Sequence, residues 1–290
     1  MRLFIFGIGY TARALIDTHH DRFSYISGTV RSPEKAKELN ALGISAHIFA
    51  PNNAALIADI VQADAILASI PPGTGRDPAL TLLSEHDLSL RAHWIGYLST
   101  VGVYGDHAGA WVDEKSPTLT LNIRSQHRLI AEADWRGVAN TLGARDFIFR
   151  LPGIYGPGRN NLRDIAKGTA RHIIKADQVF NRAHVEDIAA GIIATLTEEV
   201  PAGIYNLTDD EPASQGDVVT YAAGIMGIEP PPPVHFEAAE MSEMARSFYL
   251  ENKRVSNAKL RALPAFDLTF PTYREGLAAL LQAGEGAITD

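Results

Sequence analysis

The beginning of the chain places a strand, a glycine-rich turn and a helix start in direct succession. An apolar run of strand length covers residues 2–6, and Gly-Ile-Gly-Tyr-Thr-Ala follows at 7–12 before a helix-like segment. Gly7 permits a tight turn, Gly9 lets a ligand approach the backbone, and Ala12 lets the helix pack closely on the strand. Because the N–H groups of a helix start attract anions, this succession predicts a phosphate-binding turn. The alternative is a strand–turn–helix unit without a ligand.

Strand-like and helix-like segments alternate through the first half of the chain. The apolar segments that we interpret as further strands cover residues 23–30, 44–49, 63–70, 94–98 and 146–151. Short apolar strands separated by helices are typical of a parallel sheet that is covered on both faces. The sequence therefore predicts an α/β protein with a doubly wound parallel sheet of the Rossmann type.

The alternation becomes less regular after residue 151. A turn-rich stretch covers residues 152–158, and the later segments are shorter and more polar. We predict a dinucleotide-binding domain at 1–150, to which residues 183–207 return, and a smaller substrate-binding portion at 151–290. In open α/β sheets the ligands bind at the carboxyl ends of the strands, so we expect the second portion to cover that edge.

The composition excludes several classes of partner. The chain has 290 residues, a formal net charge of -8 and no cysteine. The negative charge disfavours broad binding to nucleic acid, and thiolate or disulfide chemistry is absent. We find no His/Asp/Glu spacing typical of a metal site, no signal segment and no apolar run of about 18 residues. We therefore expect a cytoplasmic protein that binds no metal, nucleic acid or membrane.

The end of the second predicted strand indicates which dinucleotide binds. Residues 28–32 read Gly-Thr-Val-Arg-Ser and contain no acidic residue for the 2′-hydroxyl of NAD. Arg31 lies 24 residues after Gly7, where that acid is expected, and a guanidinium suits bidentate binding of a phosphate. We predict that NADP is preferred to NAD, with Arg31 and Ser32 at the 2′-phosphate. The alternative is a solvated loop arginine.

Two further groups of residues are expected to contact the same cofactor. Tyr10 and Thr11 begin the first helix, directly after the glycine turn. Ser69, Ile70 and Pro71 follow the fourth predicted strand, where small residues permit close approach of a ligand. The same small residues also suit a simple exit from a strand into a turn.

Three later segments resemble a known superfamily. Residues 99–105 read Ser-Thr-Val-Gly-Val-Tyr-Gly, residues 152–159 begin Pro-Gly-Ile-Tyr-Gly-Pro-Gly, and residues 182–189 open a later helix. Together and in this order they resemble the extended short-chain dehydrogenase/reductases, which include nucleotide-sugar epimerases and dehydratases. The resemblance covers nearly the whole chain, and it implies an NAD(P)-binding Rossmann fold with Pro152 beside the cofactor.

The resemblance also implies the positions of the catalytic residues. Thr100 matches the residue that hydrogen-bonds the reacting oxygen, and a Tyr-x-x-x-Lys pair is expected about 24 residues later. The matching positions are Arg124 and Arg128. Arg128 can still donate to a ribose, but Arg124 cannot replace a tyrosine because a guanidinium stays protonated. The chain therefore resembles the atypical branch that lacks the usual tyrosine.

Two residues are candidates for the missing function. Arg124 could act as an electrostatic clamp, which requires its guanidinium to line one pocket with the Thr100 hydroxyl. Tyr104 lies near the expected nicotinamide end, although a packing tyrosine is the alternative. A literal Tyr-x-x-x-Lys spacing occurs at Tyr249–Lys253, far from the expected helix, and we interpret it as a chance match for catalysis.

Polar residues near the predicted cleft suggest an anionic substrate. We expect substrate contacts from Arg159, Asn160, Arg182, Arg246 and Tyr249. Converging arginines suit a phosphorylated or carboxylate compound such as a nucleotide sugar, and scattered solvated arginines are the alternative. The sequence predicts an NAD(P)-dependent oxidoreductase or epimerase/dehydratase-like enzyme, as a monomer or homodimer. The second hypothesis is a non-catalytic NADP-binding sensor or partner module.

Overall fold

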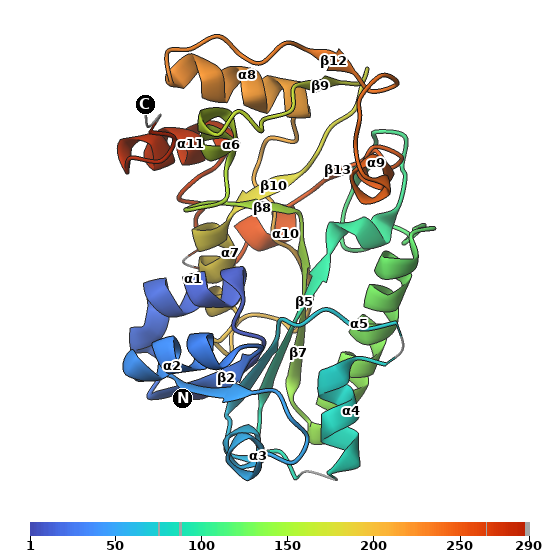
Figure 1. The fold of residues 1–290 in the computed structure, drawn as a ribbon. Helices are drawn as coiled ribbons and strands as arrows, with labels where there is room; N and C mark the ends of the chain where they lie inside the picture. Colours follow the sequence, from blue (N-terminus) through green and yellow to red (C-terminus); the bar gives the residue numbers. More distant parts are fainter. Residues whose placement is uncertain (75, 87–88, 265, 288–290) are drawn as a thin grey trace.

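A parallel sheet forms the centre of the protein in a computed structural model, which describes residues 1–74, 76–86, 89–264 and 266–287. The seven strands lie in the order β11-β7-β5-β4-β1-β2-β3 (Figure 1). All neighbouring pairs are parallel, so the predicted doubly wound α/β fold is confirmed. The strands are β1 (Arg2–Phe6), β2 (Tyr25–Val30), β3 (Ser45–Ile48), β4 (Ala65–Ala68), β5 (Trp94–Thr100), β7 (Arg145–Leu151) and β11 (Gly203–Asn206).

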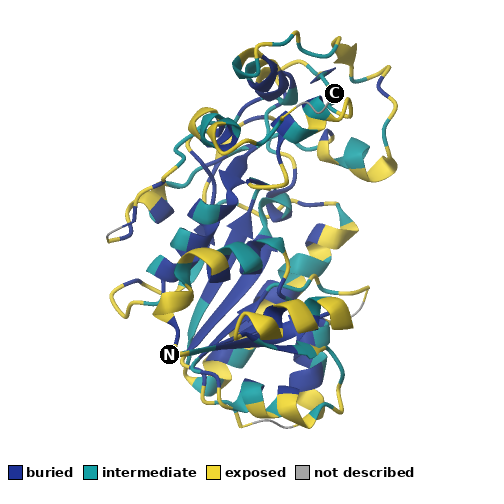
Figure 2. Cartoon of the chain, turned by 60° about the vertical axis from the view of Figure 1, so that its left-hand side comes forward, coloured by how far each residue is buried: buried dark blue, intermediate teal, exposed yellow. Residues whose placement is uncertain are grey.

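The sheet is buried because its strands carry apolar side chains on both faces. Phe4 and Phe6 of β1 point to one face and Ile5 to the other, and all three are fully buried. Trp94 of β5 stacks on Phe147 of β7, with ring centroids 5.7 Å apart. Figure 2 shows the buried strands between helices whose outer sides are exposed.

Helices cover both faces of the sheet. The face with Ile5 packs against α1 (Tyr10–His19), α2 (Pro33–Ala41) and α7 (Val185–Ala194). The face with Phe4 and Phe6 packs against α3 (Ala54–Val61), α4 (Pro78–Glu85) and α5 (Ile123–Leu142). Trp135 of α5 is fully buried, with its ring centroid 6.0 Å from that of Phe6.

The strand order reverses at β1. The chain runs from β1 through β2 to β3 on one side of the sheet, and then crosses to β4 on the other side of β1. The crossovers leave β1 and β4 in opposite directions, so a crevice opens at the carboxyl ends of these two strands. This edge is the expected ligand site of the fold.

A smaller portion of the chain lies over the carboxyl edge of the sheet (Figure 1). Its main core joins helices α6, α8 and α11, and two short parallel pairs, β8–β10 and β9–β12, flank that core. The bounds are β8 (Gly153–Tyr155), α6 (Asn161–Ala166), β9 (Ile173–Ile174), β10 (Arg182–His184), α8 (Gln215–Ile225), β12 (Val234–His235) and α11 (Tyr273–Gln282).

Short elements connect this portion to the loop that follows β5. The 3-10 turn η2 (Val101–Tyr104) continues from β5, and β6 (Trp111–Val112) pairs in parallel with β13 (Arg254–Val255). Helices α9 (Glu243–Phe248) and α10 (Ala258–Arg261) lie on either side of β13 in the sequence. The pairing brings the chain near residue 253 close to the end of β5. None of the described helices is long and apolar enough to cross a membrane.

His184 is a buried cap at the start of α7. Its Nδ1 accepts from the Glu186 N–H at 3.3 Å, and its ring lies against Tyr155 and Phe270. The Nε2 atom is buried without a hydrogen-bond partner among the described residues. Burial lowers the pKa of His184 from 6.5 to about 4. The folded protein therefore holds a neutral imidazole that the unfolded chain would protonate at mildly acidic pH.

We expect the contribution of His184 to stability to decrease as the pH falls from 7 to 4. The pKa of His184 is lower in the fold, about 4, than its ordinary 6.5, so the unfolded chain binds the proton first. At 1.4 kcal/mol for each pH unit between the two values, the loss is roughly 3 kcal/mol. Urea unfolding at pH 7, 6, 5 and 4 measures it. The matched variant His184→Asn keeps a capping oxygen and should show a shallower pH dependence; an identical slope would contradict the assignment.

Candidate functional site

The turn between β1 and α1 is held in a shape that requires glycine. Gly7 has φ +88°, and an ideal Cβ placed on it would lie 2.4 Å from Ile70 Cγ2. The Gly7 N–H donates to Thr29 Oγ1 at 2.8 Å, and the Ile8 N–H donates to the Thr29 carbonyl at 2.8 Å. The end of β2 therefore fixes the turn, and Ile70 after β4 closes it from the other side.

The start of α1 fits a phosphate group. An ideal Cβ on Gly9 would meet nothing closer than 4.0 Å, so the space above this residue is open. No side chain caps α1, whereas every other described helix of eight or more residues has a side-chain cap. Ala12 is fully buried against the sheet. The backbone amides at this helix start are thus available to an anion, as a bound pyrophosphate requires.

The loop after β8 reaches back to the same helix start. The Tyr10 hydroxyl donates to the Pro157 carbonyl at 3.0 Å, and the Arg159 guanidinium lies 5.8 Å from the Tyr10 ring centroid. Burial raises the pKa of Tyr10 to about 12, so this phenol remains neutral at physiological pH. Residues 157–159 therefore contact the first residue of α1, and Thr11, the next residue of that helix, is buried.

The other predicted cofactor residues lie along the same edge of the sheet. Arg31 follows β2 and is exposed, and Ser32 caps α2 by accepting from the Lys35 N–H at 3.3 Å. Ser69, Ile70 and Pro71 follow β4, and the Ser69 N–H donates to the Phe6 carbonyl at 2.8 Å. A capping serine keeps its own hydroxyl proton, so Ser32 can still donate to a phosphate oxygen.

A cavity of about 520 Å³ opens where the smaller portion meets the ends of β5 and β7. It combines residues from the sheet edge with residues from the C-terminal part of the chain. Its lining residues are Thr100, Val101, Gly102, Pro152, Gly153, Arg159, Val179, Phe180, Asn181, Arg182, Gln215, Ala245, Phe248, Tyr249, Glu251 and Lys253. Thr100, Pro152, Arg159, Arg182 and Tyr249 are thus brought together as the sequence suggested.

Thr100 ends β5 and lines this cavity. Its Oγ1 accepts from the Gly102 N–H at 3.1 Å, which fixes the side chain over the turn η2. A threonine hydroxyl has one proton and two lone pairs. The hydroxyl proton of Thr100 therefore remains available for an oxygen atom of a ligand.

Arg124 does not meet the requirement of an electrostatic clamp. The residue is exposed on the first turn of α5 and is not among the residues that line the cavity. Ser125 takes the inward position of that turn, with its Oγ 2.8 Å from the ideal Cβ position of Gly102. The spacing from Thr100 identified the correct helix, α5. Arg124 lies on the outer side of that helix, so the prediction that it acts as an electrostatic clamp is wrong.

Tyr104 also occupies a structural position. It is fully buried, and its hydroxyl donates to Asn206 Oδ1 at 2.8 Å. The Arg150 guanidinium lies 4.8 Å from its ring centroid, and burial raises the pKa of Tyr104. Because Tyr104 does not line the cavity, the packing alternative replaces its predicted catalytic role.

Arg128 lies one turn further along α5 and is half-buried. Its guanidinium donates to the Leu98 carbonyl and lies 5.9 Å from the centroid of the Tyr97 ring. These contacts hold Arg128 against β5, close to the strand end that carries Thr100. Its role at a ribose stays a prediction.

A buried ionic network that was not predicted from the sequence lies beneath Thr100. Arg150 of β7 donates to both carboxylate oxygens of Glu132, at 3.1 and 2.8 Å. The Ser99 hydroxyl donates to Glu132 Oε1 at 2.5 Å. All three residues are at most 5% exposed. The network ties α5 to β5 and β7 at the end of the sheet that forms the floor of the site.

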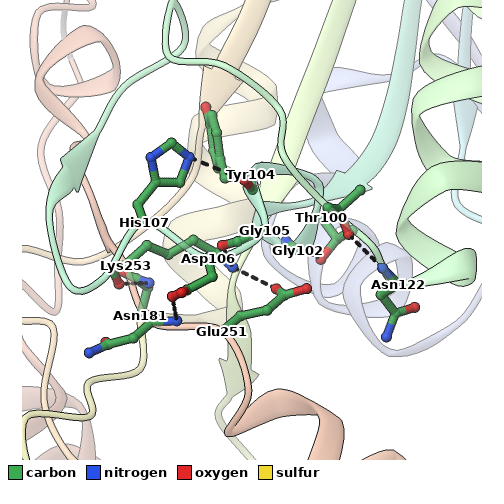
Figure 3. Close-up of polar contacts among 12 residues, drawn as sticks. Thr100, Gly102, Tyr104, Gly105, Asp106, His107, Asn122, Asn181, Glu251 and Lys253 are labelled. Atoms are coloured by element: carbon green, nitrogen blue, oxygen red, sulfur yellow. Dashed lines mark hydrogen bonds and ion pairs between the residues drawn. The ribbon is translucent and has the colours of Figure 1, made fainter.

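An ion pair in the cavity wall was also missed. Lys253 Nζ donates to Glu251 Oε2 at 2.8 Å and to the Gly105 carbonyl at 2.7 Å, and Figure 3 shows both side chains beside Gly105. Lys253 is only 6% exposed. The Asn181 amide donates to the Lys253 carbonyl at 3.1 Å and fixes the backbone. Tyr249 and Lys253, whose spacing we interpreted as a chance match for catalysis, both line the cavity.

The predicted substrate residues differ in how far they can contact a ligand. Arg159 is exposed and lines the cavity, but Arg182 is buried and donates to the carbonyls of residues 180, 213 and 214. Arg246 donates to the Ala239 carbonyl and does not line the cavity. Asn160 is buried and caps α6, accepting from the Arg163 N–H at 3.1 Å. Of the three arginines that we expected to contact the substrate, only Arg159 both lines the cavity and has its guanidinium available for a ligand.

Comparison with curated proteins finds two relatives of similar identity. Protein YeeZ of Escherichia coli K12 is 27% identical over 242 residues, which cover 78% of this chain and 84% of the relative. The 3-diazoavenalumate denitrifying reductase of a Streptomyces species is 26% identical over 190 residues, which cover 60% of this chain and 58% of the relative. No family model matches the chain.

Solved structures agree with the observed fold. A functionally unknown conserved protein from Silicibacter pomeroyi DSS is 40% identical, with a TM-score of 0.88 and coverage of 98% of this chain and 99% of that one. A human epimerase family protein with NADPH has a TM-score of 0.75 at 17% identity, covering 97% and 99% of the two chains. UDP-glucose 4-epimerase of Thermotoga maritima has a TM-score of 0.78 at 13% identity, covering 97% and 98%.

Proposed function

We propose that the chain, which belongs to one family with the conserved Silicibacter pomeroyi protein, is an NADP-dependent oxidoreductase of the epimerase/dehydratase-like branch of the short-chain dehydrogenase/reductases, without the usual tyrosine. A nicotinamide cofactor is supported by the neighbours whose structures contain NADPH or NAD. The reductase among the curated relatives supports a reduction rather than an epimerisation. The substrate is a small molecule that carries an anionic group and a reducible centre.

One observation carries the proposal. The glycine turn, Arg31 and the cavity that holds Thr100 all lie at the carboxyl edge of one parallel sheet. The turn fits a pyrophosphate because Gly9 is open and α1 has no side-chain cap. A cofactor bound there would extend along this edge toward Thr100 and Pro152, as in other open α/β sheets.

Thr100 and Lys253 have the groups that such a reaction needs. The bound cofactor would supply or accept a hydride. Thr100 can donate its hydroxyl proton to the reacting oxygen, because its own Oγ1 is already fixed by the Gly102 N–H. Lys253 carries three N–H groups, and two of them are held by Gly105 and Glu251. The third can supply a proton to the substrate, which the guanidinium of Arg124 cannot do.

We expect Arg31→Ala to weaken NADPH binding by 10- to 100-fold while NADH binding changes little. Charge-assisted hydrogen bonds to a phosphate contribute about 1.5–3 kcal/mol, and NADH lacks the 2′-phosphate. Fluorescence titration with each cofactor gives both dissociation constants. Arg22→Ala, another exposed arginine, is the matched control. If the wild-type protein binds NADH as tightly as NADPH, the preference for NADP is wrong.

A screen of aldehydes, ketones and sugars distinguishes an enzyme from a sensor. Oxidation of NADPH is followed by its absorbance, with the protein and each compound present together. Turnover of one compound supports the oxidoreductase. Tight binding of NADPH without turnover of any compound would favour the second hypothesis, a non-catalytic sensor, whose main support is the absence of the usual tyrosine at position 124.

A further inference from the structure

The cavity wall is rich in aromatic side chains. Phe180, Phe248 and Tyr249 all line it, and the Phe180 and Tyr249 rings pack edge to face with centroids 4.9 Å apart. Phe248 is 62% exposed although it faces the cavity. An exposed phenyl ring beside a buried ring and a partly buried ring offers apolar surface that a ligand would cover.

Most polar side chains of the wall are already bound to the protein. Arg182 donates to three backbone carbonyls and to Gln215 Oε1, at distances of 2.8–3.4 Å. The Asn181 amide donates to the Lys253 carbonyl, and its Oδ1 accepts from the Val255 N–H at 2.8 Å. These groups have little capacity left for a ligand, although sequence alone counts them as polar.

Besides the ion pair and the side-chain amide nitrogen of Gln215, two positions retain capacity for a polar ligand. The Thr100 hydroxyl keeps its proton, as described above. The Arg159 guanidinium makes no hydrogen bond or ion pair with the described part of the chain. Lys253 neutralises the negative charge of Glu251. The Glu251 carboxylate therefore does not cancel the attraction between Arg159 and an anionic ligand.

A nucleotide sugar does not suit such a wall. Each sugar hydroxyl or phosphate oxygen that loses water without gaining a partner costs about 1–3 kcal/mol. The wall offers few open donors and acceptors for the many polar atoms of that ligand. An aromatic ring needs none, and it gains from stacking on Phe248 and Tyr249.

We infer that the cavity binds an aromatic carboxylic acid, with its ring against Phe180, Phe248 and Tyr249 and its carboxylate at Arg159. The inference rests on the proposed function, because it names the substrate class of the same site. It replaces the nucleotide sugar that the sequence suggested. The ring of the ligand packs against the aromatic wall, and its single carboxylate pairs with the Arg159 guanidinium.

Direct binding tests this inference without any reaction. Benzoate, phenylacetate, phenylpyruvate and cinnamate are titrated into the protein by calorimetry, with and without NADP, beside acetate, pyruvate and UDP-glucose. We expect at least one aromatic acid to bind 10-fold or more tightly than the aliphatic acids and UDP-glucose. Tighter binding of UDP-glucose, or no binding of any aromatic acid, would overturn the inference.

Variants locate the two parts of the ligand. Phe248→Ala and Arg159→Ala should each weaken the best aromatic acid by about 10-fold. Leu250→Ala, an exposed apolar residue outside the cavity lining, and Arg22→Ala are the matched controls and should leave it unchanged. An unchanged affinity in both Phe248→Ala and Arg159→Ala also overturns the inference. NADPH titration is done separately, so failure of the cofactor proposal is seen independently of failure of the aromatic acid.

Discussion

Glu132→Gln lowers the free energy of unfolding by about 3–5 kcal/mol, the cost of removing one partner from a buried ion pair. In this variant Arg150 keeps its positive charge but loses the negatively charged partner. Because Arg150 is buried, water cannot replace that partner. The loss of the Ser99 hydrogen bond to a charged acceptor adds to the effect. Urea unfolding, followed by circular dichroism, measures the change.

A double variant separates the charge from the packing in this network. Glu132→Gln with Arg150→Met leaves no unpaired buried charge, and we expect it to recover part of the lost stability. Glu38→Gln removes an exposed carboxylate that pairs with Arg13 and should change stability by less than about 1 kcal/mol. A Glu132→Gln protein as stable as the wild type would show that the ion pair is not formed.

Lys253→Arg reduces turnover by about 10²–10⁴, the usual contribution of a general acid or base. The substituted guanidinium keeps the positive charge beside Glu251, but it has no proton to exchange at physiological pH. The affinity for NADPH should remain within a factor of two, since Lys253 lies away from the glycine turn. The measurement uses the best substrate found in the screen of carbonyl compounds.

The split between kcat and KM distinguishes a proton donor from a structural lysine. Loss of a proton donor should lower the kcat of Lys253→Arg and leave its KM nearly unchanged. Lys167→Met, on the exposed end of α6, is the control with unchanged kinetics. If Lys253→Arg retains wild-type turnover, Lys253 is not the proton donor and Thr100 acts with water alone.

The sheet was predictable because strands that are buried on both faces appear in the sequence as short apolar runs. The apolar runs at 63–70 and 94–98 correspond to β4 and β5. Both faces of these strands are buried, so their sequences are continuously apolar and do not alternate between apolar and polar residues. Gly7 and Gly9 were predictable for a related reason: the turn excludes any Cβ at one position and leaves open space at the other.

The cavity was only partly predictable because its wall depends on distant contacts. Thr100 and Arg159 follow strands, so the carboxyl edge fixes their place. Lys253 reaches the site through the Gly105 carbonyl, 148 residues away in sequence, and through the β6–β13 pair. No local pattern encodes such a contact. For Arg124 the spacing identified the helix, while the packing of Ser125 against Gly102 decided which side faces outward.

The wide separation of Thr100 and Lys253 has a consequence for how the protein is made. Strand β5 ends at Thr100, and the strand that positions Lys253 begins at Arg254, after the last strand of the large sheet. A chain still on the ribosome can therefore complete all seven strands of the sheet while the part of the cavity wall at residues 245–253 is missing. During synthesis the glycine turn at residues 7–12 can form early, whereas the Glu251–Lys253 ion pair forms only near the end. A nicotinamide cofactor bound by the nascent chain would therefore lie in a cavity that still lacks Lys253.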